Sequence, residues 1–159
     1  MGMDVIGRKP TSKEGEYFRN NVWWWRPLAD YCMRVAPDIA ARCKYWHSND
    51  GYGLDERDSL ALADLLQAEI DSGRCASYAR VRESELELLP NERCQLCEGT
   101  PPRRVPPDRG AGNLLTGMKC NACDGEGFKR PWACWYDFDV ENVREFVGFL
   151  RGCGGFAIW

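Results

Sequence analysis

The sequence has no long hydrophobic run, and no stretch approaches the roughly 20 apolar residues that a membrane-spanning helix needs. The opening residues, MGMDVIGRKP, lack the apolar segment of a signal peptide. They also fail the N-myristoylation pattern, because Ile6 stands where Ser or Thr is required. We therefore expect a protein that works in the cytoplasm and has no membrane partner.

The familiar motifs of catalysis are absent as well. The sequence contains no P-loop, no G-x-S-x-G, no H-E-x-x-H and no glycine fingerprint of a dinucleotide-binding fold. Its single histidine, His47, follows Cys43 by four residues, but the spacing identifies no orienting residue or oxyanion loop for a nucleophilic pair. We therefore favour a binding protein over an enzyme. A hydrolase or nuclease built on His47 and acidic residues stays open as an alternative.

The sequence also has no strong excess of positive or negative side chains. The 159 residues include 21 basic and 24 acidic side chains, which gives a net charge of −3. A net acidic chain gains little non-specific attraction to DNA or RNA, so a nucleic-acid partner is disfavoured. The apolar fraction of 44% excludes disorder of the whole chain, and the length fits one domain with a small appended module.

Cysteine, by contrast, is abundant. Nine cysteines without an export signal point to a reducing compartment, in which thiols bind metal or remain free. Four of them form two C-x-x-C pairs, Cys94 with Cys97 and Cys120 with Cys123, each followed closely by glycine. Two such pairs supply four thiolates for a tetrahedral ion and leave no open position for substrate, so we expect a structural Zn²⁺. Free or redox-active dithiols and an iron–sulfur cluster are the alternatives.

These knuckles resemble half of the zinc-binding region of DnaJ-type chaperones, whose motif is C-x-x-C-x-G-x-G. Residues 120–127, CNACDGEG, match that motif in full, whereas the first knuckle has Pro101 in place of the second glycine. The resemblance implies zinc ligation by the four cysteines. It does not extend to chaperone activity, because the chain has two knuckles instead of four and no HPD signature.

Longer segments of the chain are similar to a family of small uncharacterised bacteriophage and prophage proteins. The similar segments are GRKPTSKEGEYFRNNVWWWRPLADYC, SLALADLLQ and ENVREFVGFLRGCGGFAIW. The resemblance implies a phage accessory protein in the cytoplasm of a bacterial host cell. By analogy with other such proteins, it would counter host defence by binding a host protein or sequestering a signalling nucleotide.

Hydrophobic periodicity predicts an α+β fold. The expected strands are residues 3–6, 132–138 and 156–159, and the expected helices are residues 27–35, 37–46, 55–72 and 140–150. Residues 74–90 fit either a helix or a strand. We expect a small mixed sheet from the two termini and 132–138, with helices packed on one face. The predicted domains are an α+β body, residues 1–93 and 132–159, and an inserted zinc-binding module, residues 94–131.

Aromatic and basic residues are the candidates for binding a partner. Three consecutive tryptophans on a helix span about 200°, so they cannot all share one face. For the run at 23–25 we expect core packing of two and leave an exposed recognition side chain as the alternative. The predicted partner-binding residues are Trp23, Trp24, Trp25, Arg103, Arg104 and Arg109. They would contact a host protein or, alternatively, a nucleotide or nucleic acid through stacking and phosphate contacts.

Two further clusters have simpler interpretations. Cys43 and His47, completed by Cys32 or Cys75, could form a second metal site, although a capping or hydrogen-bonded histidine is the default expectation. The acidic residues at 50–58 could bind a cation. Carboxylates in the first turn of the predicted 55–72 helix, where the helix dipole favours them, explain most of this cluster.

Overall fold

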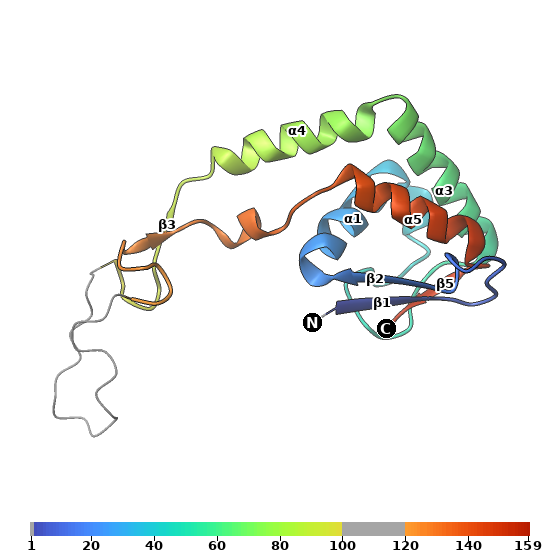
Figure 1. Ribbon diagram of the computed structural model, residues 1–159, viewed down its shortest axis with the longest axis horizontal. Helices are drawn as coiled ribbons and strands as arrows, with labels where there is room; N and C mark the ends of the chain where they lie inside the picture. The colour runs from blue at the N-terminus through green and yellow to red at the C-terminus, as the bar shows by residue number, and fades with distance from the viewer. Residues whose placement is uncertain (1, 100–119) are drawn as a thin grey trace, which may run out of the picture. The chain divides into compact units, whose positions relative to one another are not determined.

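The protein is described by a computed structural model, which covers residues 2–99 and 120–159 (Figure 1). The chain divides into two compact units, Met1–Ser84 with Trp135–Trp159, and Glu85–Cys134. We call the first unit the body and the second the cysteine unit. The predicted zinc-binding module, residues 94–131, lies within the cysteine unit. Among the described residues, no helix combines the length and the apolar character that crossing a membrane requires.

The body contains a three-stranded sheet built from the two ends of the chain. β1 (Gly2–Gly7) is the central strand and pairs antiparallel with β2 (Tyr17–Asn21) and with β5 (Phe156–Ile158). Val5 pairs with Ile158 in this register. The predicted pairing of the C-terminal strand with the N-terminal strand is therefore confirmed, and so is the α+β class.

The third strand of this sheet is not the one predicted. Residues Trp132–Trp135, expected to begin a strand, form a 3₁₀ turn (η1), and β2 takes the third place in the sheet. The turn closes where the Cys134 amide donates to the Pro131 carbonyl at 3.0 Å. Pro131 also fixes its own φ at a value that suits a turn. A short run of bulky apolar residues cannot by its periodicity tell a strand from a helical turn.

The helical elements follow the predicted pattern with shifted ends. They are α1 (Val22–Val35), α2 (Pro37–Ala40), α3 (Glu56–Asp71), α4 (Arg74–Glu87) and α5 (Val140–Gly152). The helices expected at 55–72 and 140–150 are confirmed as α3 and α5. The ambiguous segment after residue 73 is the helix α4. The helix expected over 37–46 is much shorter, because α2 ends at Ala40 and a loop follows.

Helix α1 begins five residues before the predicted start at Pro27. The Asn21 side chain accepts a hydrogen bond from the Trp24 amide at 3.0 Å and so caps the helix. Pro27 lies inside the helix, although a proline cannot donate a hydrogen bond to the preceding turn. The cap residue, and not the proline, therefore marks where this helix begins.

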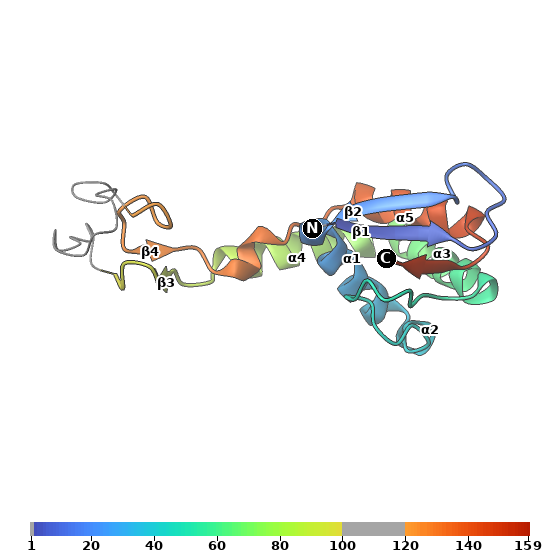
Figure 2. The ribbon, with the colours of Figure 1, turned by 90° about the horizontal axis from the view of Figure 1, so that it is seen from below.

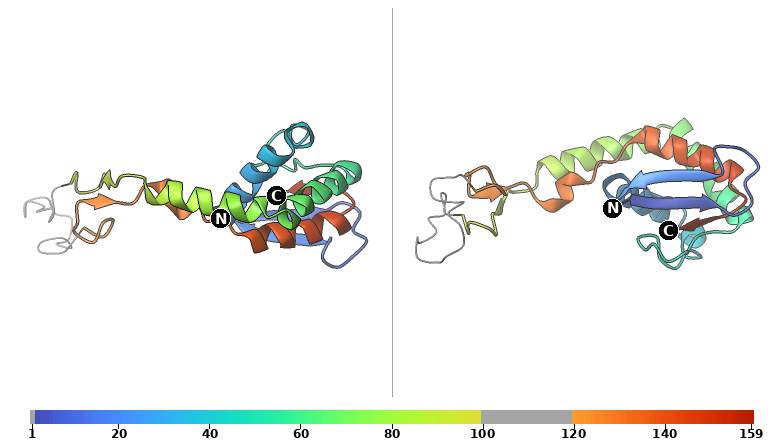
Figure 3. Two further views of the ribbon diagram at one scale, coloured as in Figure 1. Left: turned by 90° about the horizontal axis from the view of Figure 1, so that it is seen from above. Right: turned by 60° about the horizontal axis from the view of Figure 1, so that its bottom comes forward.

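The helices of the body cover one face of the sheet, and Figure 2 views the sheet from its other face. The strand side chains Val5 and Phe18 point toward the helices and are buried, whereas their neighbours Ile6 and Tyr17 are exposed. Phe146 of α5 is fully buried between the two layers, with its ring centroid 5.1 Å from that of Phe18. The single buried face agrees with the predicted layer arrangement, which the two views of Figure 3 also show.

The outer edge of β5 is covered by an extended segment after α2. The Phe156 amide donates to Leu54 O at 2.9 Å, and the Ile158 amide donates to Tyr52 O at 2.8 Å. A Cβ atom on Gly53 would lie 1.9 Å from Phe156 O, so only glycine allows this approach. The segment satisfies the backbone groups that an edge strand would otherwise leave unpaired.

Candidate metal centre

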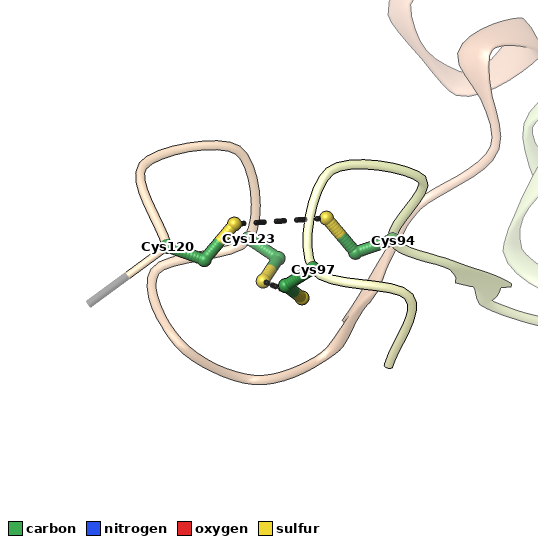
Figure 4. A group of neighbouring side chains, drawn as sticks. All are labelled: Cys94, Cys97, Cys120 and Cys123. Atoms are coloured by element: carbon green, nitrogen blue, oxygen red, sulfur yellow. Dashed lines mark hydrogen bonds between the residues drawn. The ribbon is translucent and has the colours of Figure 1, made fainter. Parts of the chain in front are cut away.

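The four cysteines of the two predicted knuckles lie together in the cysteine unit (Figure 4). Their sulfurs all lie within 4.8 Å of one another. Sγ of Cys94 is 3.8 Å from Sγ of Cys120, and Sγ of Cys97 is 3.6 Å from Sγ of Cys123. A tetrahedral ion with metal–sulfur bonds of 2.3 Å requires sulfur–sulfur edges of about 3.8 Å. The cluster therefore has the dimensions of a four-thiolate metal site.

A short antiparallel ladder brings the two knuckles together. β3 (Glu92–Arg93) runs into the first knuckle, and β4 (Phe128–Lys129) leaves the second. The Cys94 amide donates to the Gly127 carbonyl at 2.8 Å, which continues the ladder to the edge of the cluster. The ladder holds two segments distant in sequence side by side and so places the two C-x-x-C pairs next to each other.

Left-handed backbone turns aim the sulfurs at one point. Gly99, Gly125 and Gly127 have φ values of 75°, 86° and 81°, as the sequence led us to expect for glycine after each pair. Glu98 and Asp124 also adopt positive φ, at 54° and 49°, which the sequence analysis did not anticipate. Both residues directly follow the second cysteine of a C-x-x-C pair. This shared position is the feature of the sequence that could have predicted their shared backbone conformation.

Backbone amides stabilise negative charge on the sulfurs. The Cys97 amide, helped by that of Leu96, lowers the pKa of the Cys94 thiol to about 6. The Gly127 amide donates to Sγ of Cys123 at 3.2 Å. Burial acts in the opposite direction on Cys97 and raises its pKa to about 12. A metal cation bound at the centre of the cluster would displace the protons that remain on the thiols, because cysteine binds metal as the thiolate.

The sulfurs are also sealed from solvent. All four cysteines are buried, the most exposed of them at 7%, and together they form a cluster separate from the core of the body. The set contains no histidine and no carboxylate. A metal ion in this cluster would have protein sulfur on every side, which suits a structural role and leaves no position for a substrate.

The tryptophans predicted to bind a partner are placed differently from one another. Trp25 is 0% exposed, and its Nε1 donates to Trp46 O at 2.7 Å, so the assignment of Trp25 to a partner surface is wrong. Trp23 and Trp24 are half-buried, and Trp23 lies 5.1 Å from the Tyr136 ring. One of the three, instead of the expected two, is in the buried core. The predicted Arg103, Arg104 and Arg109 lie outside the described residues.

The second metal site considered for Cys43 and His47 does not form in the part of the chain that the structure describes. Within this described part, the only group of three or more Cys, His, Asp or Glu side chains close enough to share a metal ion is the four-cysteine cluster. His47 Nε2 lies 3.0 Å from Asp30 Oδ1, so the histidine is hydrogen-bonded, as in the default interpretation. Burial raises the pKa of the Cys43 thiol to about 11, which makes it a poor nucleophile at neutral pH.

Two of the acidic residues at 50–58, Asp55 and Asp58, have structural partners. Asp55 caps α3 by accepting from the Asp58 amide at 2.8 Å. The Asp58 carboxylate pairs with Arg42. These contacts agree with the simpler interpretation of the cluster as a helix start.

Comparison with known proteins gives no relative from which a function could be transferred. The chain matches no protein-family model, and no curated protein and no solved structure matches it.

Proposed function

We propose that the four cysteines bind one Zn²⁺ ion with a structural role. The observation that carries the proposal is the cluster of four buried sulfurs, whose spacing fits a tetrahedron of zinc–thiolate bonds. Zinc is favoured over an iron–sulfur cluster because glycine-bearing C-x-x-C knuckles are typical of zinc sites. The closed ligand set supports a role in folding and not in catalysis.

The ion would take the place of a hydrophobic core in the cysteine unit. Among the described residues of this unit, the buried side chains are the four cysteines and Pro131. Zinc binding by four thiolates supplies on the order of 10 kcal/mol of apparent free energy, which is enough to fold a segment that has almost no apolar core. The metal then determines whether Glu85–Cys134 is folded.

Metal content in two serine variants tests this proposal. We expect one zinc per chain in the native protein and a loss of most of it in Cys120→Ser, because one of four ligands is removed. Cys134→Ser is the matched control, since Cys134 belongs to the same unit but lies outside the cluster. Elemental analysis of the purified variants measures the ratio. Equal zinc content in both variants, or none in the native protein, would overturn the proposal.

We further propose that the chain is a binding protein for a host protein, in keeping with the resemblance to phage proteins. Exposed tryptophans support this: Trp135 and Trp159 both have more than half of their surface in solvent. The Trp159 ring lies directly over Gly51, where any Cβ would come within 2.7 Å of it. A large aromatic side chain held in place at the surface is the type of residue that dominates protein interfaces.

Capture from bacterial lysate with matched variants tests the binding function. We expect one host protein to be recovered at a one-to-one ratio and its recovery to fall about tenfold in Trp159→Ala or Trp135→Ala, as for an interface hot spot. Leu65→Ala is the control, because Leu65 is an exposed apolar residue on α3. Quantitative mass spectrometry measures recovery. Absence of any enriched host protein, or equal recovery by all variants, would contradict the proposal.

A further inference from the structure

The body contains an open pocket at the C-terminal end of α1, separate from the cysteine unit. Its volume is about 520 Å³, within the range of small-molecule binding sites. Met33 of α1, Pro37 and Ala40 of α2, and residues of the loop 41–48 line it. The α2 region is labelled in Figure 2.

The wall of this pocket is fixed by contacts with the core. Trp46 is 3% exposed, and its Nε1 donates to Ala40 O at 3.0 Å. Its backbone carbonyl accepts from Trp25 Nε1, and the two indole rings stack with centroids 6.2 Å apart. On the next residue, His47 is hydrogen-bonded to Asp30 of α1. The loop is therefore anchored at both Trp46 and His47, and these contacts fix the wall of the pocket.

The lining combines apolar surface with one lysine and one histidine. Met33, Ala40, Ala41 and Trp46 contribute apolar surface, and no carboxylate lines the pocket. The ammonium group of Lys44 lies 5.0 Å from the centroid of the Tyr45 ring. None of the ion pairs recorded among the described residues involves Lys44. The ring of Tyr52 also lies 6.0 Å from this ammonium group, so its described neighbours are aromatic and its charge is not neutralised by a carboxylate.

We propose that this pocket binds a small flat aromatic molecule that carries one negative charge, such as an aryl carboxylate. The apolar wall takes the ring, because burying apolar area is the main source of affinity in such sites. Lys44 takes the anion through a charge-assisted hydrogen bond. A cation of the same shape would meet Lys44 as a like charge, and the carboxylates bonded to lining residues, Asp30 on His47 and Asp50 on Ser48, already accept hydrogen bonds from the lining.

Methyl NMR with three probes of one shape tests the proposal. The chain has four methionines, so methyl-labelled methionine gives few signals, and Met33→Leu assigns the one in the pocket. The probes are 2-naphthoate, neutral 2-naphthamide and cationic 2-naphthylmethylammonium. We expect saturable movement of the Met33 signal with naphthoate, at an affinity about tenfold above that for the other two. No movement of this signal with naphthoate at millimolar concentration, or equal affinity for the cation, overturns the proposal.

Three variants separate the charge from the cavity. Lys44→Met should weaken naphthoate binding about tenfold and leave naphthamide unchanged, whereas Lys13→Met, an exposed lysine in the β1–β2 loop, should change neither. Ala41→Leu should fill the pocket and weaken both ligands, since Ala41 lines it without belonging to the buried core. Unchanged naphthoate affinity in Lys44→Met or in Ala41→Leu would refute the assignment.

Discussion

Trp25 links three parts of the body through one side chain. Its ring meets Phe146 of α5 edge-on at 5.8 Å, and its Nε1 holds the carbonyl of Trp46 in the loop after α2. The indole therefore supplies apolar area and a hydrogen bond at the same buried place. The run of three tryptophans predicted that they could not all share a face. Which of them is buried could not be predicted, because it depends on the true start of α1 at Val22.

Replacing this indole by a phenyl ring tests its polar role. Trp25→Phe should lower the free energy of unfolding by about 1–3 kcal/mol, because the Trp46 carbonyl loses its donor in a buried place. Trp135→Phe is the control, since Trp135 is 60% exposed and should change stability little. Urea unfolding followed by far-UV circular dichroism measures both. Equal stability of the two variants would show that the Trp25 hydrogen bond contributes nothing.

Among the elements, those with strong local signals were predictable. α3 and α5 begin at aspartate caps, Asp55 and Asp139, and present apolar residues at helical spacing. β2 was missed, because Phe18 is the only apolar residue at its two buried positions and the other is Asn20. The strand predicted at 132–138 was wrong because its apolar residues suit a strand locally, whereas Trp132–Trp135 form a 3₁₀ turn that follows Pro131.

The N-terminal cap of α1 allows a test of where this helix begins. Asn21→Ala should reduce the free energy of unfolding of the body by about 1 kcal/mol, because the Trp24 amide loses its acceptor. Asn91→Ala, at an exposed position outside any helix, is the matched control. Thermal unfolding monitored by circular dichroism measures the difference. A variant as stable as the control would mean that α1 starts elsewhere.

At the scale of the whole molecule, the two units depend on different physical effects. The body has an extensive buried core that includes Trp25, Phe146 and Leu62. The described part of the cysteine unit buries little besides its four sulfurs. The sequence predicted which four cysteines lie together, because two C-x-x-C pairs in one short segment are typical of a single four-thiolate site. It did not predict the supporting contacts, such as Arg130 donating to Leu86 O at 2.8 Å, since a lone arginine carries no signal of its partner.

Hydrogen exchange during chelation tests the central claim, that a bound ion is what folds the cysteine unit. On removal of zinc, we expect the amides of Cys94 and Gly125 to lose their protection from hydrogen exchange. The hydrogen bond of the Cys94 amide joins the two knuckles, and that of the Gly125 amide closes the second knuckle. The amides of β1 and α5 should keep theirs, because the core of the body contains no metal ligand of this cluster. Protection at Cys94 and Gly125 that survives complete loss of zinc would contradict the account.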